Sequence, residues 1–156
     1  MRPILQALLV ADHVYVDAAT NKKIVAGIFH RLLLAKAKVE TVDQPVGEIS
    51  GEGARKIEIP IGGHQPGSPF CYISVTEVRG KQPFTLRYVN LDDDKALFQT
   101  EFQLECANPL ETVEAVFPLP VLPAREAGHY ALELLWGQEP LGCHRITIIA
   151  TPQPES

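Results

Sequence analysis

The feature that most constrains this chain is the spacing of its apolar residues. Short runs in which apolar and polar residues alternate recur along the sequence, and Pro, Gly, Asn and Asp separate them. No segment of similar length shows the 3.6-residue period of an amphipathic helix. Alternation places successive side chains on opposite faces of an extended strand. The sequence therefore predicts an all-β protein, an antiparallel β-sandwich of about eight or nine strands.

The first predicted hairpin pairs residues 4–17 with residues 24–34, and a polar turn joins them. The start of segment 4–17 is apolar on both faces, which is typical of a strand inside a structure. Gly27 lies within the second strand and indicates a bulge or a point of close approach. Further strands are predicted at 70–78, 84–89, 98–105, 113–117, 130–136 and 141–150.

One domain, residues 1–150, contains all of these strands, and 156 residues suffice to bury a core. Residues 35–69 form a long turn-rich connection with six glycines and four prolines. A short edge strand is predicted there at Ile57–Ile61, and a functional loop is expected in the same connection. Residues 151–156 are polar and rich in proline, so a disordered tail is expected.

Charge and composition exclude several classes of function. Apolar residues make up 46% and charged residues 21% of the chain, which is typical of a globular protein. The formal net charge is −5, and the 14 basic residues are scattered rather than clustered. Binding to nucleic acid or an anionic membrane requires a basic patch. No run approaches the roughly 20 apolar residues of a membrane-spanning helix. We therefore expect neither a nucleic-acid nor a membrane partner.

The first eleven residues superficially resemble a secretory signal, because one basic residue precedes an apolar run. Gln6 interrupts that run, no small-x-small cleavage site follows, and strand-like alternation continues to Asp17. A buried strand is therefore the favoured interpretation.

Cys71, Cys106 and Cys143 form no CxxC pair, and their number is odd. This pattern suits a reducing compartment in which thiols act as small hydrophobes, so we expect a cytoplasmic protein. A Cys106–Cys143 or a Cys71–Cys106 disulfide is the alternative.

Asp92, Asp93 and Asp94 occupy a predicted hairpin loop and suggest a calcium site. Calcium requires several oxygens that converge on one ion, whereas three consecutive aspartates point in different directions. Aspartate is also a favoured turn residue, because its carboxylate accepts hydrogen bonds from nearby backbone. A turn is the favoured interpretation, and a metal or small-ligand site is the alternative.

The five histidines show no shared spacing. Pairing in the predicted first hairpin would bring His13 and His30 together, and a third ligand would then complete a metal site. A structural role is the favoured alternative. Gly63, His64 and Gln65 lie in a glycine-rich loop, and we take them as candidate partner-binding residues.

No recognisable catalytic motif occurs in the sequence. It lacks the Gly-x-Ser-x-Gly elbow and a phosphate-binding glycine loop. Cys143 and His144 are neighbours, but on a strand they face opposite sides. The remaining candidates for a catalytic residue are His64, Cys71 and Cys143. None of them has a nucleophile or base partner at a suitable spacing. Trp136 lies on the same face of its predicted strand as the core leucines Leu132 and Leu134, which indicates burial. We expect no enzyme and no cofactor.

Two stretches resemble known proteins. Leu5–Asp17 with Lys22–Phe29 resembles a bacterial family defined only as a domain of unknown function, which implies a small cytoplasmic β-rich protein. Gly128–Trp136 with Leu141–Ile149 is similar to the terminal hairpin of immunoglobulin-like modules. That likeness implies a core tyrosine, Tyr130, whose hydroxyl bonds to backbone at the sheet corner. The Cys…Trp…Cys spacing of antibody domains is absent.

These observations favour an immunoglobulin-like sandwich that acts as a non-catalytic protein-interaction or assembly module. Sheet edges also favour self-pairing, so the partner is either another protein or a second copy in a homodimer. The alternative function is binding of calcium or a small polar ligand by the Asp92–Asp94 loop.

Overall fold

The computed structural model describes residues 1–34, 68–122 and 126–150. These residues contain nine strands and no helix, which confirms the predicted all-β class. The strands are β1 (Ile4–Val16), β2 (Lys23–Ile28), β3 (Arg31–Leu34), β4 (Phe70–Thr76), β5 (Gly80–Asn90), β6 (Lys95–Cys106), β7 (Val113–Pro118), β8 (Gly128–Trp136) and β9 (Glu139–Ala150). Over this part of the chain, no helix has the length and apolar character that crossing a membrane would take.

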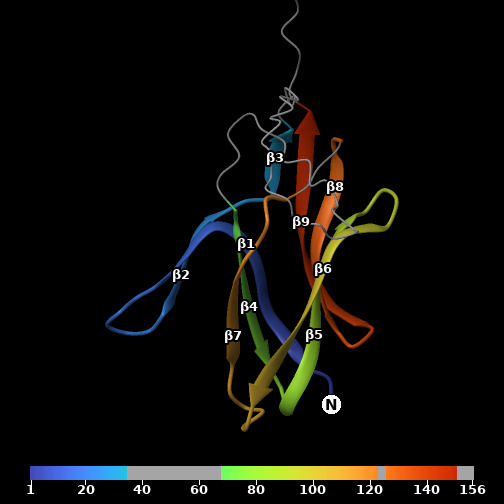
Figure 1. The fold of residues 1–156 in the computed structure, drawn as a ribbon. Helices are drawn as coiled ribbons and strands as arrows, with labels where there is room; N and C mark the ends of the chain where they lie inside the picture. Colours follow the sequence, from blue (N-terminus) through green and yellow to red (C-terminus); the bar gives the residue numbers. More distant parts are fainter. Residues whose placement is uncertain (35–67, 123–125, 151–156) are drawn as a thin grey trace, which may run out of the picture.

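The strands form two layers, as predicted for a β-sandwich (Figure 1). One layer is a four-stranded sheet in the order β2-β1-β4-β7, and the other is a five-stranded sheet in the order β3-β9-β8-β5-β6. Neighbouring strands are antiparallel except β3 and β9, which run parallel. The sandwich prediction is therefore confirmed, with one parallel pair that the sequence pattern did not indicate.

The core lies between the two sheets and follows the predicted alternation. Alternate side chains of β4, β5, β8 and β9 are buried against one another: Cys71, Ile73, Val75, Phe84, Leu86, Tyr88, Tyr130, Leu132, Leu134, Ile146 and Ile148. Burial of each large apolar side chain contributes about 1.5–3 kcal/mol. The paired inner faces therefore provide the main stabilisation of the fold.

The prediction of a single strand over residues 24–34 is wrong. The segment divides into β2, which pairs with β1, and β3, which pairs with β9 in the other sheet. Phe29 and His30 make the crossover between the sheets. The amide of Phe29 donates to the Val10 carbonyl (3.3 Å), and the amide of Thr147 donates to the His30 carbonyl (2.8 Å). Alternation assigns a face to each residue but does not indicate that a strand changes sheets.

The close approach predicted at Gly27 is confirmed. Gly27 has a φ of 75°. A Cβ at this position would lie 2.5 Å from Oδ2 of Asp12 on the neighbouring strand. Glycine is needed here because it tolerates both the left-handed backbone and the nearby carboxylate.

The terminal hairpin also matches its prediction. Tyr130, Leu132 and Leu134 face the core, and the Tyr130 hydroxyl donates to the Glu126 carbonyl at 2.9 Å. This is the sheet-corner hydrogen bond that the immunoglobulin-like resemblance implies. Trp136 is half-buried, and its Nε1 donates to Oε1 of Gln82 at 3.1 Å.

Several expectations lie outside the described residues. They are the edge strand at Ile57–Ile61, nearly all of the 35–69 connection, and the tail at residues 151–156.

Candidate functional site

Two of the three aspartates in the β5–β6 hairpin accept backbone hydrogen bonds, one within the turn and one from β8. The amide of Lys95 donates to Oδ1 of Asp93 (3.1 Å), and the amide of His129 donates to Oδ2 of Asp92 (3.4 Å). Asp94 adopts a positive φ of 57°. Asp92 is thus directed towards the start of β8, while Asp93 is directed back into its own turn. Across residues 1–34, 68–122 and 126–150, no three His, Cys, Asp or Glu side chains are placed to hold a metal ion.

The structure does not bring His13 and His30 together as predicted, because His30 lies in the crossover rather than in the β1–β2 hairpin. His30 stacks instead on His144, with ring centroids 4.4 Å apart and planes 17° from parallel. His144 is buried, and its Nε2 donates to the Phe29 carbonyl at 2.8 Å. Burial is the main cause that lowers the pKa of His144. The neutral imidazole therefore fixes the crossover to β9.

The cysteines lie apart from one another and are free. Cys71 is buried in β4, and this burial raises its pKa to about 12, so the thiol stays protonated. Cys143 is exposed on β9 and faces away from the buried His144, as the strand parity predicts.

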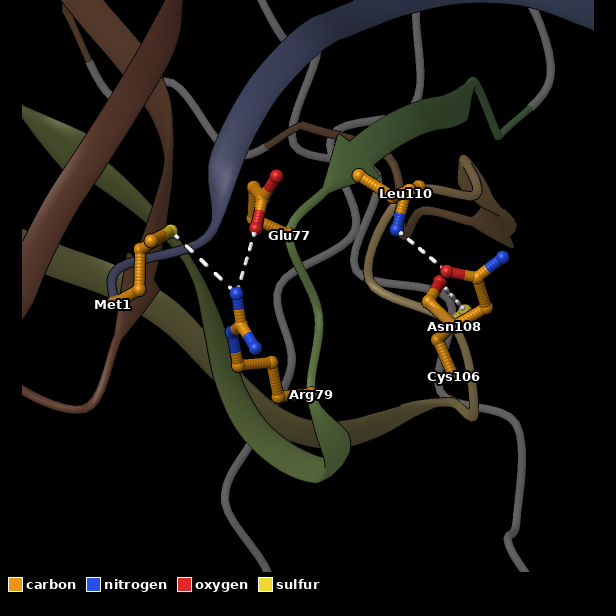
Figure 2. Close-up of polar contacts among 6 residues, drawn as sticks. All are labelled: Met1, Glu77, Arg79, Cys106, Asn108 and Leu110. Atoms are coloured by element: carbon orange, nitrogen blue, oxygen red, sulfur yellow. Dashed lines mark hydrogen bonds and ion pairs between the residues drawn. The ribbon is translucent and has the colours of Figure 1, made fainter.

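Cys106 lies at the end of the sandwich shown in Figure 2. Its thiol donates to the Asn108 carbonyl at 3.1 Å, within the turn that joins β6 to β7. In the same view, Arg79 contacts the carboxylate of Glu77 (3.3 Å) and Sδ of Met1 (3.7 Å). These contacts order the connections at this end of the molecule. None of them pairs a thiol with a base.

The candidate partner-binding residues Gly63, His64 and Gln65 lie outside the described residues. The described chain instead carries a surface that the sequence reasoning missed, on the four-stranded sheet. We call this surface the outer face.

The outer face consists of the side chains that the register turns away from the core. Leu8 and Val10 of β1 pair with Ile73 and Cys71 of β4 and face the core, so the alternate positions face outwards. These positions are Ile4, Ala7, Leu9, Ala11, His13, Tyr15, Ile24, Ala26, Ile28, Phe70, Tyr72, Ser74, Thr76, Glu114, Val116 and Pro118. Among these described positions, Glu114 is the only residue that is an aspartate, glutamate, lysine or arginine.

The outward side of the five-stranded sheet carries more charged residues than the outer face does. Seven of its positions carry charge: Arg31, Lys81, Arg87, Glu101, Glu105, Glu133 and Arg145. Arg87 and Glu133 form an ion pair, with Nε and Oε2 2.6 Å apart. A sheet with one side in water normally shows this polar pattern. The outer face has far fewer charged positions, although Tyr15, Ile24 and Ile28 are 53%, 50% and 46% exposed.

Three exposed apolar residues of the outer face, Tyr15, Ile24 and Ile28, lie on a projecting hairpin. β1 pairs with β4 only as far as Ala11 and with β2 from Ala11 to Val16. The hairpin of residues 11–28, which we call the arm, consequently extends beyond β4 (Figure 1, blue). Asp17 orders its tip by accepting hydrogen bonds from Thr20 Oγ1 (2.6 Å) and the Ala19 amide (3.1 Å).

Aromatic contacts connect the arm to the rest of the outer face. His13 stacks on Tyr15 with centroids 5.6 Å apart and lies 6.3 Å from the ring of Phe70. The single acid of the outer face, Glu114, accepts a hydrogen bond from the Tyr72 hydroxyl. Its other carboxylate oxygen lies 3.6 Å from Nζ of Lys23. The charge of Glu114 is therefore compensated within the chain.

No protein-family model matches the sequence, and no curated protein shows significant sequence similarity to it.

Proposed function

We propose that this protein is a non-catalytic interaction or assembly module whose contact surface is the outer face of the four-stranded sheet. The observation that carries the proposal is that, within the described residues, this sheet surface has no charge without a partner in the chain, while Tyr15, Ile24 and Ile28 remain half exposed. Exposed apolar side chains gathered on one surface are typical of a site that another protein covers.

The composition of the outer face supports the same proposal. Protein interfaces are enriched in aromatic residues and depleted in charged residues at their centre. The aromatic residues His13, Tyr15, Phe70 and Tyr72 contribute to a face with one carboxylate, Glu114. The partner that fits is a protein with an apolar surface of low charge, because a strongly charged partner would find no counter-charge here.

The proposal also includes a cellular location and a protein family. A cytoplasmic location is supported by the three free thiols, because disulfides are favoured in oxidising compartments. Membership of the bacterial family of unknown function rests on the resemblance of Leu5–Asp17 and Lys22–Phe29.

The experiment that tests the contact surface is photo-crosslinking in the native cell. A photoreactive amino acid is placed at Tyr15 on the outer face or, as a matched control, at Leu110, which is 82% exposed in the β6–β7 turn (Figure 2). We expect a specific protein adduct from position 15 and none from position 110. A Tyr15→Lys variant that keeps the melting temperature of the wild type should lose the partner in affinity capture. Identical adducts at both positions, or unchanged capture, would contradict the proposal.

A further inference from the structure

The arm turns back along the outward side of the four-stranded sheet. In Figure 1 it leaves the top of the sheet and points down beside β7. One ion pair agrees with this course: Nζ of Lys23, near the tip of the arm, lies 3.6 Å from Oε2 of Glu114 on β7. β2 and β7 are opposite edges of the sheet, with β1 and β4 between them. The arm therefore reaches across the outer face towards the far edge.

The arm leaves the sheet at an interruption in its own ladder. The β1–β2 ladder pairs Ala11 with Ile28, skips Asp12 and Gly27, and then continues towards the tip. Gly27 has a left-handed φ of 75°. A few residues at the end of an element, often small ones, are where proteins absorb the change of backbone angle in a hinge motion. Asp12 and Gly27 therefore form a hinge between the arm and the sheet.

The arm has no packing against the core to fix its position. Its apolar side chains lie outside the hydrophobic core of the described residues: Val14, Tyr15, Val16, Ile24, Val25 and Ile28. The contact of His13 with Phe70 is close to the hinge. Among the described residues, the polar contact that joins the tip to β7 is the Lys23–Glu114 ion pair. Since a two-stranded ribbon without core packing is only marginally stable, the position of the arm depends on this ion pair.

The Lys23–Glu114 ion pair is partly shielded from water. The side chains are 19% exposed for Lys23 and 37% exposed for Glu114. Lys95 also pairs with an acid, Asp93, but 79% of its side chain is exposed. The Tyr72 hydroxyl donates to Glu114 and orients the carboxylate on the outer face. Because shielding strengthens the attraction between opposite charges, this pair is suited to hold the tip of the arm.

We propose that the arm is a strap over the outer face, which the Lys23–Glu114 ion pair holds closed and which opens by rotation at Asp12 and Gly27. This inference rests on the proposed function, because it describes how access to that contact surface is regulated. The closed strap lies over the part of the outer face that β4 and β7 provide. A partner that covers this part binds the open form preferentially, and its binding shifts the arm towards that form.

The first test measures the position of the arm in the full chain. Nitroxide labels are attached to the exposed native Cys143 on β9 and to Ala18→Cys at the tip of the arm. Pulsed electron paramagnetic resonance then gives the distribution of the distance between the labels. Glu114→Gln removes the charge that faces Lys23 but keeps an acceptor for the Tyr72 hydroxyl. We expect a second distance in this variant, with the ratio of open to closed arms raised about two- to fivefold, the range for a partly exposed ion pair.

Two control variants accompany this measurement. Glu101→Gln removes the same charge from an exposed position on β6 and should leave the distance distribution unchanged. Lys23→Glu combined with Glu114→Lys reverses the ion pair and should restore the closed distance. A distribution that Glu114→Gln does not alter would overturn the inference, and so would a reversed pair that leaves the arm open.

The second test measures access to the outer face. The photoreactive amino acid at Tyr15 should give more of its protein adduct when combined with Glu114→Gln, by the same factor as the rise in open arms. Combined with Glu101→Gln, it should give the yield of the wild type. An unchanged or lower yield with Glu114→Gln would overturn this inference alone. The absence of an adduct from all of these proteins would contradict the proposed function, and the regulation would be overturned with it.

Discussion

The contact between His144 and the Phe29 carbonyl gives the sharpest prediction about stability. His144 is 3% exposed, and its Nε2 lies 2.8 Å from that carbonyl oxygen. His144→Phe keeps an aromatic ring to stack on His30 but removes the donor. The Phe29 carbonyl then loses the partner that the imidazole provided, where the chain crosses between the sheets.

Loss of this hydrogen bond should lower the free energy of unfolding by about 1–3 kcal/mol, the usual cost of a buried polar group without a partner. For a chain of this size, each kcal/mol corresponds to a fall in melting temperature of roughly 2–4 °C. The matched control is His30→Phe, which keeps the ring stack at an exposed position. It should cost less than about 1 kcal/mol, because its Nδ1 contact with the Arg145 carbonyl (3.3 Å) is exposed to water.

The pH dependence follows from the same contact. Burial, the largest cause, lowers the pKa of His144 below its ordinary value of 6.5, and the facing His30 lowers it further. The unfolded chain therefore binds a proton at a higher pH than the folded chain does. The contribution of His144 to stability is complete above pH 6.5 and is lost as the pH falls from there through the folded-state pKa.

Urea denaturation at a series of acidic and neutral pH values measures both effects. The wild type should lose stability on acidification more steeply than His144→Phe, and the two curves should converge at low pH. Equal stability at neutral pH together with equal acid slopes would refute this account of the crossover.

Three further predictions concern other parts of the molecule. Gly27→Ala should lower the free energy of unfolding by more than about 1 kcal/mol, as measured in the same urea assay. Gly137→Ala should cost less. Both glycines have a positive φ, but no atom lies within 4 Å of a Cβ built at position 137. A thiol reagent should label Cys143 in the native protein and leave Cys71 unlabelled until the chain unfolds, which mass spectrometry of the labelled peptides would show. Millimolar calcium should leave the melting temperature unchanged, because the carboxylates of Asp92 and Asp93 are directed to different elements. A ligand at 100 times its Kd would instead add about 2.7 kcal/mol of stability.

Much of the fold could be predicted because one sheet face is buried. The parity of Tyr130, Leu132 and Leu134 gave the core side of β8, and the same argument placed Cys71 and Ile73 of β4. Each of these strands stays in one sheet, so the local pattern is sufficient. Residues 24–34 differ, because β3 pairs with β9 and that contact is remote in the sequence. Gly27 was the only local sign of irregularity in this segment.

The outer face was harder to predict from the sequence. The start of the first strand is apolar on both faces, a pattern that predicts burial inside the structure. The interpretation holds for Leu8 and Val10, but Tyr15 lies beyond the end of β4 and is 53% exposed. An apolar face that packs against the core and an apolar face that stays exposed both show apolar residues at every second position of the strand. Only the spatial position of neighbouring strands distinguishes them.

The crossover at Phe29 and His30 has a consequence for how the protein is made. His144 follows Phe29 by 115 residues, and β3 finds its partner strand in β9. A ribosome must therefore synthesise β9 before β3 can pair within its sheet. Contacts between such distant segments slow folding. Until β9 has been made, β3 lacks the strand beside which it lies in the folded protein, and surface exposed for such a time favours association between chains.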